Sequence, residues 1–195
     1  MVTHQVLGRL VRREASRLGI GSADEKVAIV DGAEWIAKQL NSNLPVLDIL
    51  ILDFYHLSEH IWLASNKCFG QDTEAVKQFA GTLLHLAKHD GVGSLLGAVE
   101  SERKKYRRGI KRKTLNELMG YIGHRASMCD YPGYRNKGWQ LGSGPTEAMC
   151  KVLTYRLKGA GMRWDKYGAD AIMALIALRQ SNTWESYWEG RKRAA

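Results

Sequence analysis

The chain has 195 residues, of which 45% are hydrophobic and 25% charged, and it contains three prolines. These values are typical of a soluble globular protein and exclude disordered and collagen-like chains. The longest unbroken apolar run, Ala171 to Leu178, is too short for a membrane helix, and early arginines interrupt the apolar core of any secretory signal. Three cysteines without C-x-x-C spacing predict reduced thiols and a cytoplasmic location.

The net charge of +9 is unevenly distributed. Residues 1–98 carry 9 basic and 11 acidic side chains, whereas residues 99–195 carry 20 and 9. The positive excess therefore lies in the second half, as expected of a chain with one region that faces a polyanion. A charge excess that serves solubility alone is the alternative.

The first 53 residues predict alternating helices and strands. An apolar stripe indicates an amphipathic helix over 3–18, and a second helix is expected over 33–40. Short apolar runs predict buried strands over 26–30 and 48–53. Strand, helix, strand is a βαβ unit, so the two strands should be parallel neighbours.

Beyond Asp53 the sequence predicts helices and no further strand. Helices are expected over 54–69, 73–89, 92–106 and 114–128, followed by a glycine-rich loop over 130–144. Pro145 should open a helix to about 157, and further helices are expected over 167–179 and 184–188. Two strands leave both sheet edges open, so either helices cover them or further strands are missing.

Asp31 and Asp53 follow the two predicted strands at their carboxyl ends. In open parallel sheets this edge holds ligands and catalytic groups, and converging carboxylates suit a hard cation such as Mg²⁺. Both residues also have ordinary structural explanations. Asp31-Gly32 is a good turn sequence, and Asp53 is a good N-cap for the following helix.

Three other patterns are chemically weaker. His56 and His60 have the i, i+4 spacing of zinc ligands but no glutamate in the order H-E-x-x-H. Gly142-Ser143-Gly144 lacks the first glycine of a nucleophile loop and does not follow a strand, which excludes a hydrolase. Glu147 lies in the first turn of its predicted helix, where the helix dipole favours a carboxylate in any case.

Two segments are rich in cations. Eight basic residues fall within 101–113: Arg103, Lys104, Lys105, Arg107, Arg108, Lys111, Arg112 and Lys113. Such a run can neutralise several phosphates, although a solvated helix end is the plainer interpretation. Arg156, Lys158 and Arg163 flank a glycine-containing turn that suits contact with a phosphate backbone.

Four blocks of the sequence together resemble the Kra group of bacterial insertion-sequence transposases, which belong with the Mutator-like transposases. The blocks are 31–36 (DGAEWI), 52–60 (LDFYHLSEH), 142–147 (GSGPTE) and 156–164 (RLKGAGMRW). The resemblance extends from about Leu7 to Trp188. It implies a ribonuclease-H-like α/β fold with a large helical insertion, and catalysis by three acidic residues around two Mg²⁺ or Mn²⁺ ions.

The resemblance assigns roles to individual residues. Asp31 matches the second catalytic acid and Glu147 the third, and both would bind metal. Asp53 and His56 match a block that shapes the site or contacts DNA. The implied domains are a partial core over 1–53, a helical insertion over 54–129, and a returning segment over 130–195. Double-stranded DNA is the implied partner, together with a second copy or a full-length transposase subunit, in the bacterial cytoplasm at the nucleoid.

The family's first acid and its first three strands have no counterpart in this sequence. The expectation is therefore a carboxy-terminal transposase portion with an incomplete metal site, which cleaves and transfers DNA strands poorly on its own. Two alternatives remain: a non-catalytic DNA-binding or regulatory derivative, and a decayed reading frame.

Overall fold

A computed structural model describes residues 4–194 as two compact units, one up to Ser143 and the other from Gly144 onward. The first unit holds the sheet, two 3-10 turns and seven of the described helices. Its elements are α1 (His4–Arg17), η1 (Ile20–Ser22), β1 (Val27–Val30), α2 (Glu34–Asn43), β2 (Ile49–Leu52), α3 (Phe54–Phe69), α4 (Glu74–His89), α5 (Val92–Lys104), α6 (Ile110–Gly123), η2 (Ala126–Met128) and α7 (Tyr131–Asn136). The second unit contains α8 (Gly144–Thr154), α9 (Lys166–Gln180) and α10 (Trp184–Ala194).

The two predicted strands form a parallel pair, as expected. Val27 aligns with Ile49 and Val30 with Leu52, and α2 connects the strands. The described chain is thus mostly helical and contains a two-stranded parallel sheet. This content of helices and parallel strands agrees with the predicted α/β class. The predicted first helix is confirmed from His4, whereas Thr3 lies outside the described residues.

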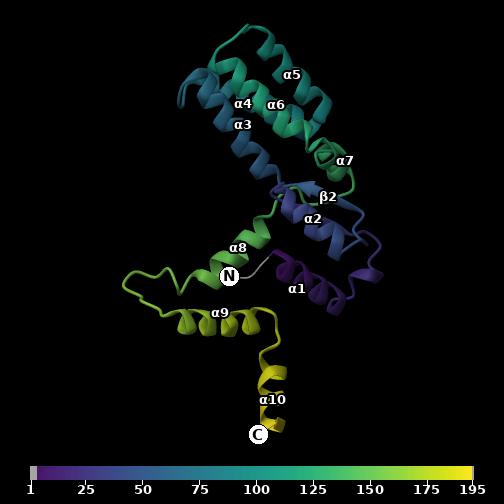
Figure 1. Cartoon of the computed structure of the whole chain (residues 1–195), viewed down its shortest axis with the longest axis vertical. Helices are drawn as coiled ribbons and strands as arrows, with labels where there is room; N and C mark the ends of the chain where they lie inside the picture. Colours follow the sequence, from purple (N-terminus) through teal and green to yellow (C-terminus); the bar gives the residue numbers. More distant parts are fainter. Residues whose placement is uncertain (1–3, 195) are drawn as a thin grey trace. The chain divides into compact units, whose positions relative to one another are not determined.

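Helices α3, α4, α5 and α6 pack side by side and share one hydrophobic core with β2 (Figure 1). Fully buried Ile51 and Leu52 from the strand join Leu57, Leu95 and Ile122 from the helices in this core. The sheet, the four helices and residues 130–143 therefore all belong to the first compact unit.

The structure corrects two local predictions in the first unit. Helix α6 begins at Ile110, inside the basic run, and ends at Gly123 instead of spanning 114–128. The expected loop after residue 130 contains α7, because the Asp130 carboxylate caps the amide of Gly133 and Pro132 fits the first helical turn. Tyr131 is buried there, and its hydroxyl donates a 3.0 Å hydrogen bond to the Leu52 carbonyl oxygen.

The helices of the second unit differ from the predictions mainly at their ends. Helix α8 ends at Thr154 instead of about 157, and α10 continues to Ala194 instead of stopping at 188. Neither α8 nor α9 contains a buried residue. Among the described residues there is no helix whose length and hydropathy would let it cross a membrane.

Candidate functional site

Asp31 lies directly after β1, at the carboxyl edge of the sheet, and its side chain is exposed. Its Oδ1 atom accepts a 2.9 Å hydrogen bond from the amide of Ala33, which closes a tight turn. Gly32 between them has a φ of +81°, and a Cβ there would lie 2.6 Å from Arg125 and 2.7 Å from Leu52. The predicted turn is confirmed, and it engages one of the two carboxylate oxygens of the exposed Asp31.

Asp53 follows β2 at the same edge, but it is buried and fully engaged by the protein. Its Oδ1 atom accepts from the amide of Tyr55 at 2.8 Å, which confirms the predicted N-cap of α3. Its Oδ2 atom accepts from both the amide and the hydroxyl of Ser143. Asp53 therefore fixes the segment that leads into α8, a long-range contact that the sequence did not indicate.

A second bond and a close approach reinforce this attachment. The Phe54 amide donates a 2.8 Å hydrogen bond to the carbonyl oxygen of Leu141. Gly142 packs so closely on the Tyr55 ring that a Cβ would lie 2.8 Å from it. The glycine-serine pair that superficially resembled a nucleophile loop thus serves to dock the chain on the start of α3.

Two side chains that sequence reasoning missed, Tyr121 and Arg125, lie beside the carboxylates. The Arg125 guanidinium donates to the carbonyl oxygen of Gly32 at 3.0 Å and to that of Tyr121 at 3.2 Å. It also covers the Tyr121 ring at 4.2 Å from the ring centre. Burial raises the pKa of Tyr121 to about 12. The nearby Arg125 charge lowers this pKa, whereas the charges of Asp31 and Asp53 raise it. The site therefore combines two carboxylates, a guanidinium and a phenol.

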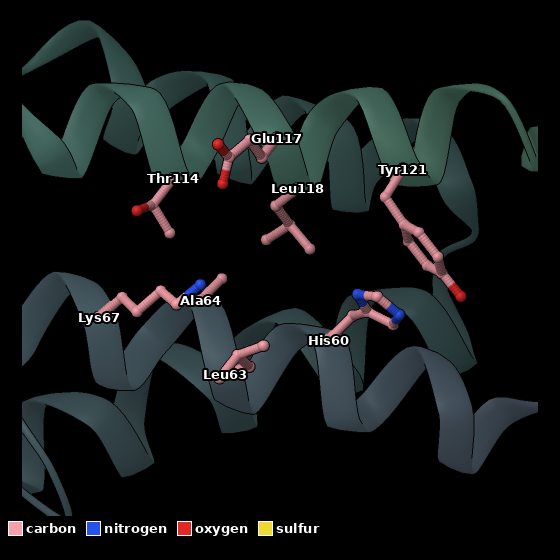
Figure 2. Close-up of a pocket in the computed structure, with 8 residues that line it drawn as sticks. All are labelled: His60, Leu63, Ala64, Lys67, Thr114, Glu117, Leu118 and Tyr121. Carbon is pink, nitrogen blue, oxygen red and sulfur yellow. The ribbon is translucent and has the colours of Figure 1, made fainter.

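The two histidines of α3 are in contact with each other, and His60 also contacts Tyr121 of this cluster. Figure 2 shows His60 of α3 facing Tyr121 of α6, and the two rings stack with centres 3.7 Å apart. They close one end of a groove of about 310 Å³ between the two helices, which also contains Lys67 and Glu117. Burial lowers the pKa of His60, and the neighbouring His56 and Arg125 lower it further.

His56 pairs within its own helix, with Nδ1 3.4 Å from a Glu59 oxygen, and its ring meets that of His60 edge to face. Over residues 4–194 no group of three or more His, Cys, Asp and Glu side chains is arranged to hold a metal ion. The donors that fit Mg²⁺ chemically are the carboxylates, and Asp31 offers an unengaged oxygen.

The basic run divides into paired and exposed cations. Arg103 forms a two-pronged ion pair with Glu100, with N–O distances of 2.5 and 2.6 Å, and Lys105 pairs with Glu102. The Lys111 ammonium lies over the rings of Phe69 and Tyr106, and Arg112 donates to the Tyr106 carbonyl oxygen. Lys104 and Lys113 reach acidic residues at 3.8 and 3.9 Å but are mostly exposed. Arg107 and Arg108 are exposed in the turn between α5 and α6, with no ion pair to any described residue.

The remaining candidates belong to the second unit. Glu147 is exposed in the first turn of α8. Arg156, Lys158 and Arg163 are exposed in the turn between α8 and α9, where the Arg156 carbonyl accepts a bond from the Trp164 indole. The structure thus gathers Asp31, Asp53 and His56 in one unit and Glu147 with these cations in the other.

Comparison of the chain with models of known families, with curated proteins and with solved structures gave no match.

Proposed function

We propose that this chain acts on DNA in transposition, in the manner of a DDE-type transposase. The observation that carries the proposal is the position of Asp31 at the carboxyl edge of two parallel strands, beside the Arg125 guanidinium. That edge is where α/β sheets place catalytic groups. In this proposal the βαβ unit is part of a ribonuclease-H-like sheet, and the α3–α6 bundle is the helical insertion that precedes Glu147.

Exposed cations support DNA as the partner. Arg107 and Arg108 lie at the tip of the α5–α6 hairpin, where their charges are not compensated by any described carboxylate. Arg156, Lys158 and Arg163 supply a second exposed set. Binding of double-stranded DNA depends mainly on such cations, because each phosphate contact releases counterions.

Asp31 and Glu147 are the proposed acids of the reaction, and Asp53 anchors Ser143 within the first unit. Carboxylates are suitable ligands for Mg²⁺ or Mn²⁺, which would polarise the phosphodiester and activate the attacking oxygen. Both carboxylate oxygens of Asp53 instead accept hydrogen bonds, one from Tyr55 and the other from Ser143. We therefore assign it no direct role in the chemistry.

The test is a cleavage and strand-transfer assay on DNA that carries the ends of an insertion sequence, with Mg²⁺ or Mn²⁺. We expect weak activity that Asp31→Asn and Glu147→Gln abolish, with DNA binding retained in both variants. Glu34→Gln is the matched control, because Glu34 is an exposed helical carboxylate after the same strand. Activity that is equal in all variants would refute the assignment of the acids.

A non-catalytic DNA-binding protein is the second candidate, because the exposed cations are available whether or not the acids bind metal. In that case the chain binds DNA in a salt-dependent manner without any cleavage, and neutralising the exposed cations of 103–113 abolishes binding. Absence of DNA binding at low salt would refute both candidates.

A further inference from the structure

The turn between α8 and α9 exposes aromatic rings to an unusual degree. Tyr155 is 80% exposed and Tyr167 is 85% exposed, and Trp164 between them is 40% exposed. Tyrosine and tryptophan normally bury most of their rings, since these carry a large apolar area. Several solvent-exposed aromatic rings at one turn indicate a binding surface.

The same turn carries positive charge that the described protein does not neutralise. Arg156, Lys158, Arg163 and Lys166 are exposed, and none forms an ion pair with a described residue. The acidic residue of the turn, Asp165, uses its carboxylate to cap α9, accepting a 2.6 Å hydrogen bond from the Gly168 amide. The aromatic–basic turn, residues 155–167, is thus both apolar and cationic.

Trp164 holds the two ends of this turn together. Its indole nitrogen donates a 3.3 Å hydrogen bond to the carbonyl oxygen of Arg156, next to Tyr155. Its ring also lies beside Gly168, next to Tyr167, where a Cβ would be 3.6 Å from the ring. The hydrogen bond therefore holds the backbone next to Tyr155 against Trp164, three positions before Tyr167.

We propose that the aromatic–basic turn binds single-stranded DNA. Exposed rings stack on unpaired bases of any sequence, while arginine and lysine contact the phosphates between them. A duplex offers the phosphates but hides the base faces, so the tyrosines select for unpaired nucleotides. The inference rests on the proposed function, because a reaction that cuts DNA strands exposes unpaired nucleotides beside its site.

A protein partner is the competing occupant, because tyrosine, tryptophan and arginine are also enriched in protein interfaces. Uncompensated charge favours DNA. Four cations outnumber the one carboxylate of the turn, that of Asp165, so the turn carries a positive excess that matches a polyanion, whereas the fully buried core of a protein interface is depleted of charge. A second copy of this chain is one such protein partner, so the test also measures self-association.

The experiment measures fluorescence anisotropy of a labelled oligothymidine of about 12 nucleotides, within the range that single-strand sites span, and of a duplex of equal length. The full chain is compared with the double variant Tyr155→Ala, Tyr167→Ala. Each stacked base is worth about 1–3 kcal/mol, and 1.4 kcal/mol is tenfold. We expect the double variant to bind the single strand at least about tenfold more weakly and the duplex unchanged.

The matched control is Tyr155→Phe, Tyr167→Phe, which keeps both rings and should retain single-strand affinity. Equal affinity of the alanine and unchanged chains for the single strand would overturn the proposal, although duplex binding would still support the proposed function. Loss of self-association in the alanine variant, seen by sedimentation without a change in DNA affinity, would overturn it in favour of a protein partner. Failure of the unchanged chain to bind either DNA would refute the proposed function itself.

Discussion

The Nε atom of Arg125 donates a 3.0 Å hydrogen bond to the carbonyl oxygen of Gly32, 93 positions earlier in the chain. This bond joins the end of the helical bundle to the turn that holds Asp31. A second donor of the same guanidinium bonds to the Tyr121 carbonyl, so the cation is held rigidly beside the carboxyl edge of the sheet. The helices after α3 thus supply one wall of the candidate site.

Gly32→Ala should destabilise the protein by about 2–3 kcal/mol, because it combines a strained positive φ with a collision. The new Cβ would meet Arg125 and Leu52 at 2.6 and 2.7 Å. Gly81→Ala is the control, since that position in α4 is exposed and has open space around it. It should stabilise the protein by about 0.5–1 kcal/mol. Urea unfolding measures both, and equal effects would contradict the packing of Arg125 on the turn.

Tyr121→Phe should leave stability unchanged or raise it by up to about 1 kcal/mol, because the buried hydroxyl has no hydrogen-bond partner among the described residues. Tyr106→Phe is the comparison. That hydroxyl donates a 2.9 Å bond to Glu102, and its loss should cost about 1–2 kcal/mol. Thermal unfolding of the two variants decides the point. A larger loss for Tyr121→Phe would show that its hydroxyl has a partner after all.

Asp53→Ala should cost about 2 kcal/mol, because it removes the N-cap of α3 together with the attachment of Ser143. Ser143→Ala keeps the cap and one of the two bonds to Asp53, so its cost should be about half as large. Hydrogen exchange at the Ser143 amide should accelerate strongly in Asp53→Ala. Unchanged protection there would mean that the segment is held by other contacts.

Stability should fall as the pH drops below about 6.5, the ordinary pKa of histidine, partly because of His60. Its folded-state pKa lies below that value, so folding favours the neutral ring. The stabilisation is complete above the unfolded pKa and is lost as the pH falls through the lower folded one. His60→Phe keeps the stack on Tyr121 and should flatten the profile of unfolding free energy between pH 7.5 and 5. His85→Phe, on another helix, serves as the control, and an equal change in both would contradict the assignment.

Residues with local signals were predictable from the sequence. The bounds of α3 follow from Asp53 as its cap and Gly70 after its end, and the short apolar runs identified both strands. The sequence placed the start of α6 at residue 114 instead of Ile110, because the preceding cations are also typical of a solvated helix end. In the structure the Lys111 ammonium lies over the rings of Phe69 and Tyr106, so part of the run is structural.

The rest of the site depends on contacts between residues far apart in the chain. The bonds from Arg125 to Gly32 and from Ser143 to Asp53 each span about 90 positions, and no spacing rule reveals such pairs. Helix α7 was missed for a different reason. The signal was present in Asp130 and Pro132, but the surrounding glycines and aromatics favoured a loop.

The basic run contains cations engaged by the hairpin and exposed cations without a partner among the described residues, such as Arg103 and Arg107 respectively. If the exposed ones bind DNA as proposed, the two classes should respond differently to substitution. Arg107→Ala with Arg108→Ala removes two exposed charges that form no ion pair with a described residue. Stability should be unchanged, while the slope of log affinity for duplex DNA against log salt should become shallower by about 2.

Arg103→Ala should behave in the opposite way. It breaks the two-pronged pair with Glu100 and a bond to Asn116, so the free energy of unfolding should fall measurably. The salt slope should stay the same, because this guanidinium is already occupied by protein acceptors. Salt-dependent anisotropy and urea unfolding of the same samples give both quantities. A shallower slope in Arg103→Ala would show that Arg103 leaves Glu100 to contact phosphate, and the division of the basic run would then be wrong.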